Sequence, residues 1–119
     1  MGIHEWDKKH ESVLRNLKKY NISAKNKELI MKFHDDLVLE NLSKPRLILY
    51  VTKMRLVARS FNKDLDKATK DDLKKYVSSI QQKDISVWTK QVYKVAVKRF
   101  YRWLGKEIGE NEKSVGGSE

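Results

Sequence analysis

The chain has 119 residues, of which 39% are hydrophobic and 35% are charged, so it can form one domain with a single modest core. Its net charge of +10 points to an acidic partner, and its single Pro and five Gly argue against an all-β fold. The absence of Cys excludes disulfide bonds, Cys-based zinc sites and thiol catalysis.

The first stretch with helical character covers residues 4–20. Its apolar stripe is thin and consists of Trp6, Val13, Leu14 and Leu17. We therefore predict that residues 1–22 form a leading helix, which packs on the core or precedes it.

Two further helices are predicted after this one. Ser23 is a suitable N-cap for a helix over residues 24–41, in which apolar residues recur at helical spacing. Ser43 can cap the third helix, and Pro45 falls in its first turn, where a missing N–H has no consequence. The third helix is apolar around so much of its circumference that we expect it to run centrally.

The last two helices have their own start signals. Thr69 and Asp72 resemble a capping box and start the fourth helix. Ser86 starts the fifth, whose apolar residues occupy an arc of roughly 140°. We predict that Gly105 is the C′ residue that ends this helix, and that residues 106–119 are a flexible tail or a truncated linker.

Five helices with short loops and no convincing strand predict an all-α fold, a compact four- to five-helix bundle. Residues 23–105 would form its main domain. No apolar run approaches the roughly 18–20 residues that span a bilayer, and the N-terminus has no apolar signal core. We therefore expect no membrane partner and a cytoplasmic location.

The positive charge is concentrated in two segments that contain no Asp or Glu. Residues 41–63 carry six basic residues: Lys44, Arg46, Lys53, Arg55, Arg59 and Lys63. Residues 86–106 carry six more: Lys90, Lys94, Lys98, Arg99, Arg102 and Lys106. The rest of the chain is nearly balanced, so the excess charge has the distribution of an electrostatic footprint.

In the fifth helix, Lys94, Lys98 and Arg102 form a ladder opposite the apolar arc. Like charges at this spacing repel each other by a few tenths of a kcal/mol per pair, and no acid lies nearby to relieve them. A polyanion is therefore the natural partner, although a solvated face is the alternative. Trp88 lies at the border of the arc and is either partly buried or a groove contact.

Other polar residues offer no site. His4, His10 and His34 lack the spacing of a metal site, so we expect no metal and no cofactor. The stretch "HDD" at residues 34–36 is interpreted as a charged helix face. Several Tyr residues lie at helical spacing and are predicted to belong to the core or its edge.

The segment "SVWTKQVYKVAVKRFYRWLG" closes the pattern of a known family. Together with "NKELIMKFHDDLVLENLSKPRLILYVTKMRLVARSF" and "KATKDDLKKYVSSI", it resembles the core-binding, SAM-like N-terminal domain of tyrosine recombinases, the phage-type integrases, in their archaeal style. The likeness covers about residues 26–105, and the final helix is its most specific element.

The resemblance implies a SAM-like orthogonal bundle that grips one side of a recombination half-site in duplex DNA, and an association with the nucleoid. By position it implies DNA contacts from the third helix through Ser43, Lys44, Arg46, Leu49 and Lys53. It implies further contacts from the fifth helix through Trp88, Thr89, Lys90, Gln91, Lys94 and Lys98. The charge pattern adds Arg55, Arg59 and Arg102 to the predicted DNA-binding residues.

The family's chemistry does not follow from this resemblance. Its nucleophilic Tyr and the Arg, Lys and His groups around it belong to a C-terminal catalytic domain, which we expect to be absent from these residues. We therefore predict a non-catalytic DNA-binding domain for DNA integration and recombination, a monomer in isolation that can assemble on DNA in a longer protein. The alternative is a helical protein-interaction module that does not bind nucleic acid.

Overall fold

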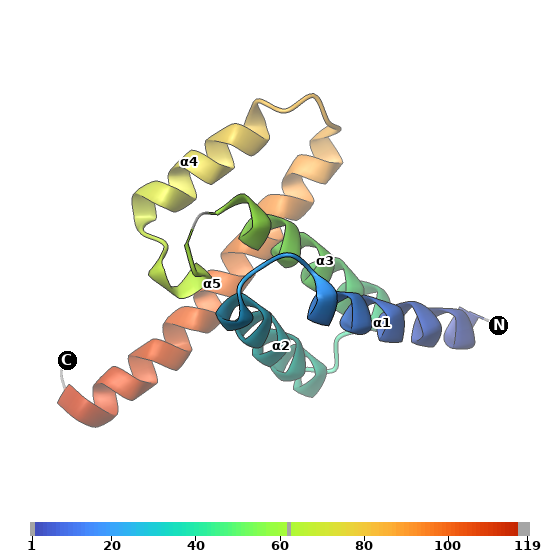
Figure 1. Cartoon of the computed structure of the whole chain (residues 1–119), viewed down its shortest axis with the longest axis horizontal. Coiled ribbons are helices and arrows are strands. Elements are labelled where there is room, and N and C mark those ends of the chain that lie inside the picture. Colours follow the sequence, from blue (N-terminus) through green and yellow to red (C-terminus); the bar gives the residue numbers. More distant parts are fainter. Residues whose placement is uncertain (1, 62, 117–119) are drawn as a thin grey trace.

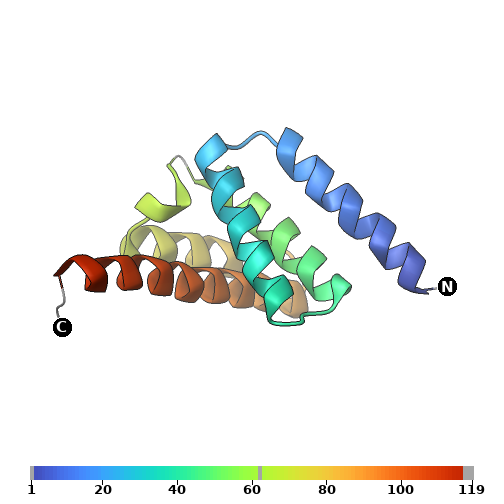
Figure 2. The same cartoon turned by 90° about the horizontal axis from the view of Figure 1, so that it is seen from below.

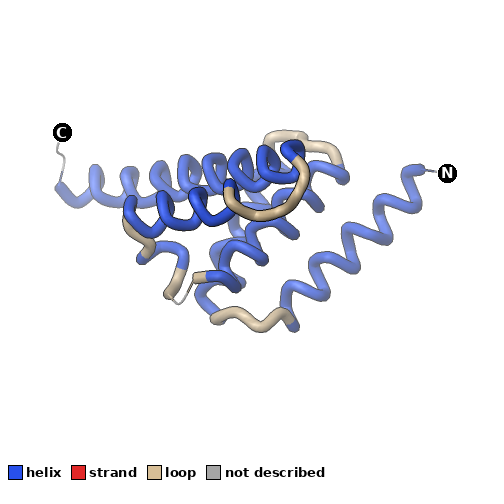
Figure 3. Tube along the Cα trace, turned by 90° about the horizontal axis from the view of Figure 1, so that it is seen from above, coloured by secondary structure: helices blue, strands red, loops and turns tan. Residues whose placement is uncertain are grey.

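A computed structural model describes residues 2–61 and 63–116, with side chains from Glu5 to Gly105 apart from position 62. All regular elements in these ranges are helical, so the prediction of an all-α bundle is confirmed (Figure 3). The helices are α1 (Gly2–Lys19), α2 (Ala24–Leu39), α3 (Lys44–Ser60), the 3₁₀ turn η1 (Leu65–Lys67), α4 (Lys70–Gln81) and α5 (Val87–Gly116).

Helix α3 lies at the centre of the bundle, as its apolar circumference predicts. It packs against α1, α2 and α5, while α4 folds back along α5 as an antiparallel hairpin (Figure 1). Figure 2 shows α1 and α5 on opposite sides of α3. This arrangement lets two separate surfaces form, one around α1 and α3 and one on the free side of α5.

The core is built around aromatic rings from three helices. Phe33 of α2 is fully buried and meets the ring of Tyr50 edge-on at 6.0 Å and that of Phe100 at 5.1 Å. Trp103 lies 5.5 Å from Phe33 and donates its indole N–H to Asp36, at 2.5 Å. Edge-on and tilted ring contacts of this kind add to the burial energy, so these residues fix how α2, α3 and α5 cross.

Side-chain caps define most of the helix starts. The Ser23 hydroxyl accepts from the N–H of Asn26, and the Ser86 hydroxyl accepts from that of Thr89, at 3.1 Å in both cases. Thr69 and Asp72 form the predicted capping box in full. Ser43 occupies the N-cap position of α3 as predicted, but its side chain makes no capping hydrogen bond.

The turn η1 was not predicted from the sequence. Its Leu65 is fully buried, and its backbone N–H donates to the Asn26 side chain at 2.7 Å. The Tyr101 hydroxyl donates to the Leu65 carbonyl at 2.9 Å, and burial raises the pKa of this phenol. Contacts with two distant helices therefore hold the segment between α3 and α4, a long-range effect that local sequence patterns do not contain.

The predicted end of the fifth helix is wrong. Gly105 lies inside α5, which continues to Gly116, and its φ is not in the left-handed region that a C′ glycine adopts. Residues 106–113 are rich in Glu and Lys and contain no Pro, so the sequence beyond Gly105 can remain helical. The tail predicted from residue 106 is therefore helical to residue 116; residues 117–119 lie outside the described part.

Replacing Gly105 with Ala should stabilise the protein, because nothing lies within 4 Å of the added methyl group. A mid-helix glycine costs about 0.5–1 kcal/mol relative to alanine, so we expect a rise of that size in the free energy of unfolding. Thermal unfolding followed by circular dichroism would measure it. A fall in stability instead would indicate that Gly105 ends the helix with a positive φ.

Candidate nucleic-acid interface

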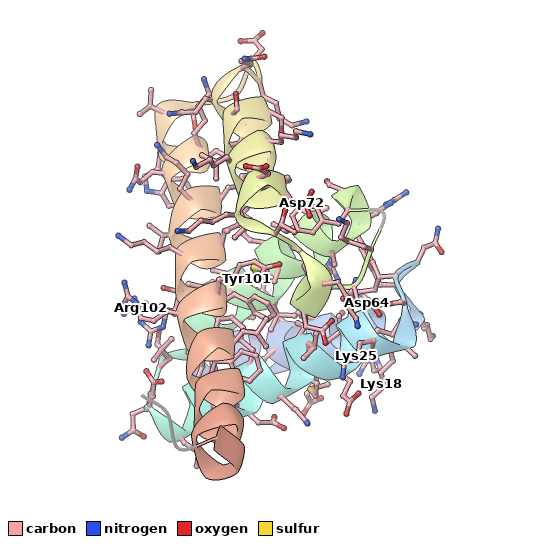
Figure 4. All side chains as sticks on the ribbon, turned by 90° about the vertical axis from the view of Figure 1, so that its left-hand side faces the viewer. Lys18, Lys25, Asp64, Asp72, Tyr101 and Arg102 are labelled. Carbon is pink, nitrogen blue, oxygen red and sulfur yellow. The ribbon has the colours of Figure 1, made fainter. Side chains whose placement is uncertain are left out.

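Helix α5 divides into a buried side and a free side. The predicted apolar arc faces the core, with Ala96 and Phe100 fully buried. The opposite side, which we call the α5 outer face, exposes Val87, Trp88, Gln91, Val95, Lys98 and Arg102. Figure 4 shows Arg102 at the left edge of α5. The amphipathic pattern thus sets the direction in which these polar groups point.

The α5 outer face carries no carboxylate. Glu40 of α2 lines a cleft of about 230 Å³ together with Arg99 and Arg102. Arg99 forms an ion pair with Glu40 and lies over the Tyr50 ring. Among the described residues, Lys98 and Arg102 form no ion pair, so their charges remain available to an external anion.

Three other predicted DNA-binding residues of α5 are only partly exposed. Thr89 bonds to the Ser86 hydroxyl at 2.8 Å, and the Lys90 ammonium donates to the Gln81 carbonyl at the end of α4, at 2.8 Å. Lys94 is half-buried. Thr89 therefore helps to cap α5, and Lys90 joins the start of α5 to the end of α4.

Trp88 is one of the most exposed large apolar residues of the described chain, at 68%. The sequence left open whether it is partly buried or a groove contact, and the structure excludes burial. Val87, at 82%, and Val95, at 40%, extend this apolar surface along the outer face. Neither valine was predicted as a functional residue, although both lie outside the predicted apolar arc, and that position is the signal that could have found them.

Helix α3 contributes a second group of cations, which we call the α3 cluster: Lys53, Arg55 and Arg59. The ammonium of Lys53 lies 4.9 Å from the ring of Tyr93 on α5. The guanidinium groups of Arg55 and Arg59 lie 4.8 and 5.7 Å from the ring of Tyr20, which follows α1. Cation–π contacts hold these charges in place without neutralising them.

The two tyrosines that hold the α3 cluster influence each other electrostatically. Burial raises the pKa of Tyr93, and the nearby Tyr20 adds a smaller effect in the same direction. Tyr20 was not predicted as a functional residue, and its position at the end of a thinly apolar helix gave no signal for it.

The structure therefore brings together only part of the predicted site. The α3 cluster lies between α3, α1 and the first half of α5, whereas the α5 outer face points away from α3. Arg46 is exposed and Leu49 half-buried on α3. Lys44 pairs with Asp7 of α1 at 3.5 Å, so its charge is already balanced, and Ser43 is exposed.

The interpretation of "HDD" as a charged helix face is wrong for its histidine. His34 is only 5% exposed, and its Nε2 lies 2.8 Å from Nε2 of His10 on α1. The signal was present, because His34 is four residues after Ile30 and three before Leu37, on the same buried stripe. Asp35 is exposed and Asp36 accepts the Trp103 hydrogen bond.

Searches for a metal site, for a membrane-spanning helix and for similar proteins add no functional assignment. Among the described residues, no group of three or more His, Asp or Glu side chains is arranged to hold a metal ion. None of the helices described is both long and apolar enough to cross a bilayer. No family model, curated protein or solved structure matches the chain.

Proposed function

We propose that this domain binds duplex DNA without catalysing a reaction, as the core-binding module of a site-specific tyrosine recombinase. The observation that supports it most is the α5 outer face, which combines exposed Lys98 and Arg102 with Gln91 and an exposed Trp88, and which carries no acid. Phosphate groups require cations, and base edges require polar or flat side chains; this face offers both.

The dimensions of this face suit a duplex. From Trp88 to Arg102 the helix rises roughly 21 Å at 1.5 Å per residue, and the major groove of DNA is wide enough to admit an α-helix. Figure 1 shows the first turns of α5, with the end of α4, projecting beyond α3. This end of the hairpin can therefore approach a groove without interference from α1 or α2.

The basic and amide side chains would contact different parts of the duplex. Lys98 and Arg102 would contact phosphates, and Arg46 is exposed on α3 for the same purpose. Arg55 and Arg59 lie over Tyr20 beside α1, so they would contact a different stretch of backbone. Gln91 can bond two atoms of an adenine edge, and Arg46 can do the same with guanine, which makes them candidates for base reading. Lys90 is a weaker candidate, because its ammonium is already bonded to the Gln81 carbonyl.

Binding should depend steeply on salt. With about five phosphate contacts, a plot of log K against log salt concentration should have a slope of about −4 to −5, because each contact releases counterions. Fluorescence anisotropy with a labelled duplex between low and physiological salt would measure it. Parallel NMR spectra should show shifts in the amides of residues 86–102. No binding at low salt, or no shift in these amides, would reject the proposal.

A protein-interaction module is the second candidate, and one observation favours it. Val87, Trp88 and Val95 form an exposed apolar strip of the kind that protein partners cover. A partner bound through this strip would resist reversal of the charges on α5, whereas DNA would not. The two functions are therefore separated by the charge-reversal experiment described in the Discussion.

A further inference from the structure

Two histidine rings join α1 to α2. Nε2 of His10 lies 2.8 Å from Nε2 of His34, and the two rings stack with their centres 5.0 Å apart. His34 is almost fully buried, and its Nδ1 lies 3.0 Å from a carboxylate oxygen of Asp35. This contact is separate from both cationic surfaces described above.

The number of protons that this pair can hold follows from the geometry. Only one hydrogen fits between two ring nitrogens at this distance, so one Nε2 must donate and the other must accept. The Asp35 carboxylate can accept only from a protonated Nδ1 of His34. The neutral pair therefore has His10 donating to His34, and a first extra proton can be held if His10 becomes the acceptor.

A second extra proton has no place in this arrangement. With both rings charged, both Nε2 atoms carry hydrogen, and two N–H groups would point at each other across a partly buried contact. We propose that this histidine pair is an acid-sensitive latch, which holds the N-terminal half of α1 on the bundle near neutral pH and releases it when both rings are protonated.

The charged groups around the histidine pair do not offset the cost of protonating both rings. The charged and titratable groups that face the pair come from three helices: Asp7 and Glu11 on α1, Asp35 on α2, and Lys44 at the start of α3. Burial lowers the pKa of His10, with Lys44 and His34 adding to the decrease, and the two acids on α1 oppose it only in part. The nearby Lys44–Asp7 pair would separate with the latch.

The lowered pKa of His10 determines whether acid stabilises or destabilises the docked state of α1. Because the docked state binds the last proton more weakly than the open state, docking is fully stable above the ordinary histidine pKa and weakens as the pH falls below about 6.5. Each further unit of pH should then favour the open state by up to about tenfold, the value for uptake of one proton. Beyond this joint, α1 retains Leu17 in the core and Tyr20 against α3.

Hydrogen exchange on the whole chain tests the latch. After correction for the chemical exchange rate, protection of the α1 amides should fall by about tenfold or more between pH 6.5 and pH 5, while α4 amides keep theirs. His10→Gln retains a group that can donate or accept but does not titrate, so its α1 protection should not change over this range. His4→Gln, the matched control, should behave like the unchanged chain.

Two results would overturn the proposal: α1 protection that does not fall with pH, or a fall that persists in His10→Gln. If His10→Gln lowers the protection of the α1 amides at every pH, the test is instead made on the histidine ring nitrogens of the unchanged chain. Their NMR shifts should titrate in two separate steps, with the α1 amides changing in the second. Uptake of both protons without any change in α1 would rule the latch out.

Discussion

Reversing two charges on the α5 outer face, in the double variant Lys98→Glu with Arg102→Glu, should reduce affinity for duplex DNA by about 100-fold at moderate salt. The salt slope should become shallower by about two, because each cation that no longer reaches a phosphate lowers it by about one. Neither residue is engaged in an ion pair within the described chain, so the change should leave the fold intact. Anisotropy titrations at several salt concentrations measure both quantities.

The control must alter the net charge by the same amount elsewhere. Lys74→Glu with Lys75→Glu places two acids on the exposed side of α4, away from both cationic surfaces. This variant should lose only the small, salt-sensitive part of the affinity that depends on total charge. If both double variants bind DNA equally well, the α5 outer face is not the interface, and a protein partner for the strip around Trp88 becomes the better explanation.

Truncating Phe33 to alanine should produce the largest loss of stability. The ring is fully buried and contacts the rings of Tyr50, Phe100 and Trp103, so its removal leaves a cavity where three helices cross. Such truncations cost about 3–5 kcal/mol, a large part of the 5–15 kcal/mol that typical domains possess. Urea denaturation followed by circular dichroism would give the difference in the free energy of unfolding.

Trp88→Ala is the matched control, since it also removes a large aromatic ring but from a site that is 68% exposed. Its effect on the free energy of unfolding should stay within about 0.5 kcal/mol. A loss of less than about 1 kcal/mol for Phe33→Ala would contradict the central position assigned to this ring.

The elements that the sequence predicted well are those with local signals. The capping box at Thr69 and the apolar arc of α5 depend on residues three or four apart, and both were confirmed. The prediction of where α5 ends was wrong, because a glycine is compatible both with a C′ position and with a helix interior. Nothing within a few residues of Gly105 distinguishes the two.

The candidate site was predicted by residue type but not by arrangement. Periodicity placed Lys98 and Arg102 on the free side of α5, and there the sequence was sufficient. It could not show that Arg55 and Arg59 lie over Tyr20, or that Lys44 meets Asp7, because these contacts join helices that are far apart in the chain. Whether two basic segments lie side by side depends on the tertiary structure. Counting charges along the sequence therefore overestimates the size of the continuous basic surface.

The cap of α4 affects the order in which parts of the bundle unfold as the pH falls. Lys63 bonds to the Asp72 carboxylate at 2.8 Å, and this contact, with the Thr69 backbone, lowers the pKa of Asp72 to about 2. An aspartate with a depressed pKa supports its helix from above its ordinary value of 3.8 and loses that role only as the pH falls through about 2. The proposed histidine latch would open several pH units earlier, so mild acidity would release the N-terminal half of α1 from a bundle in which the start of α4 is still capped.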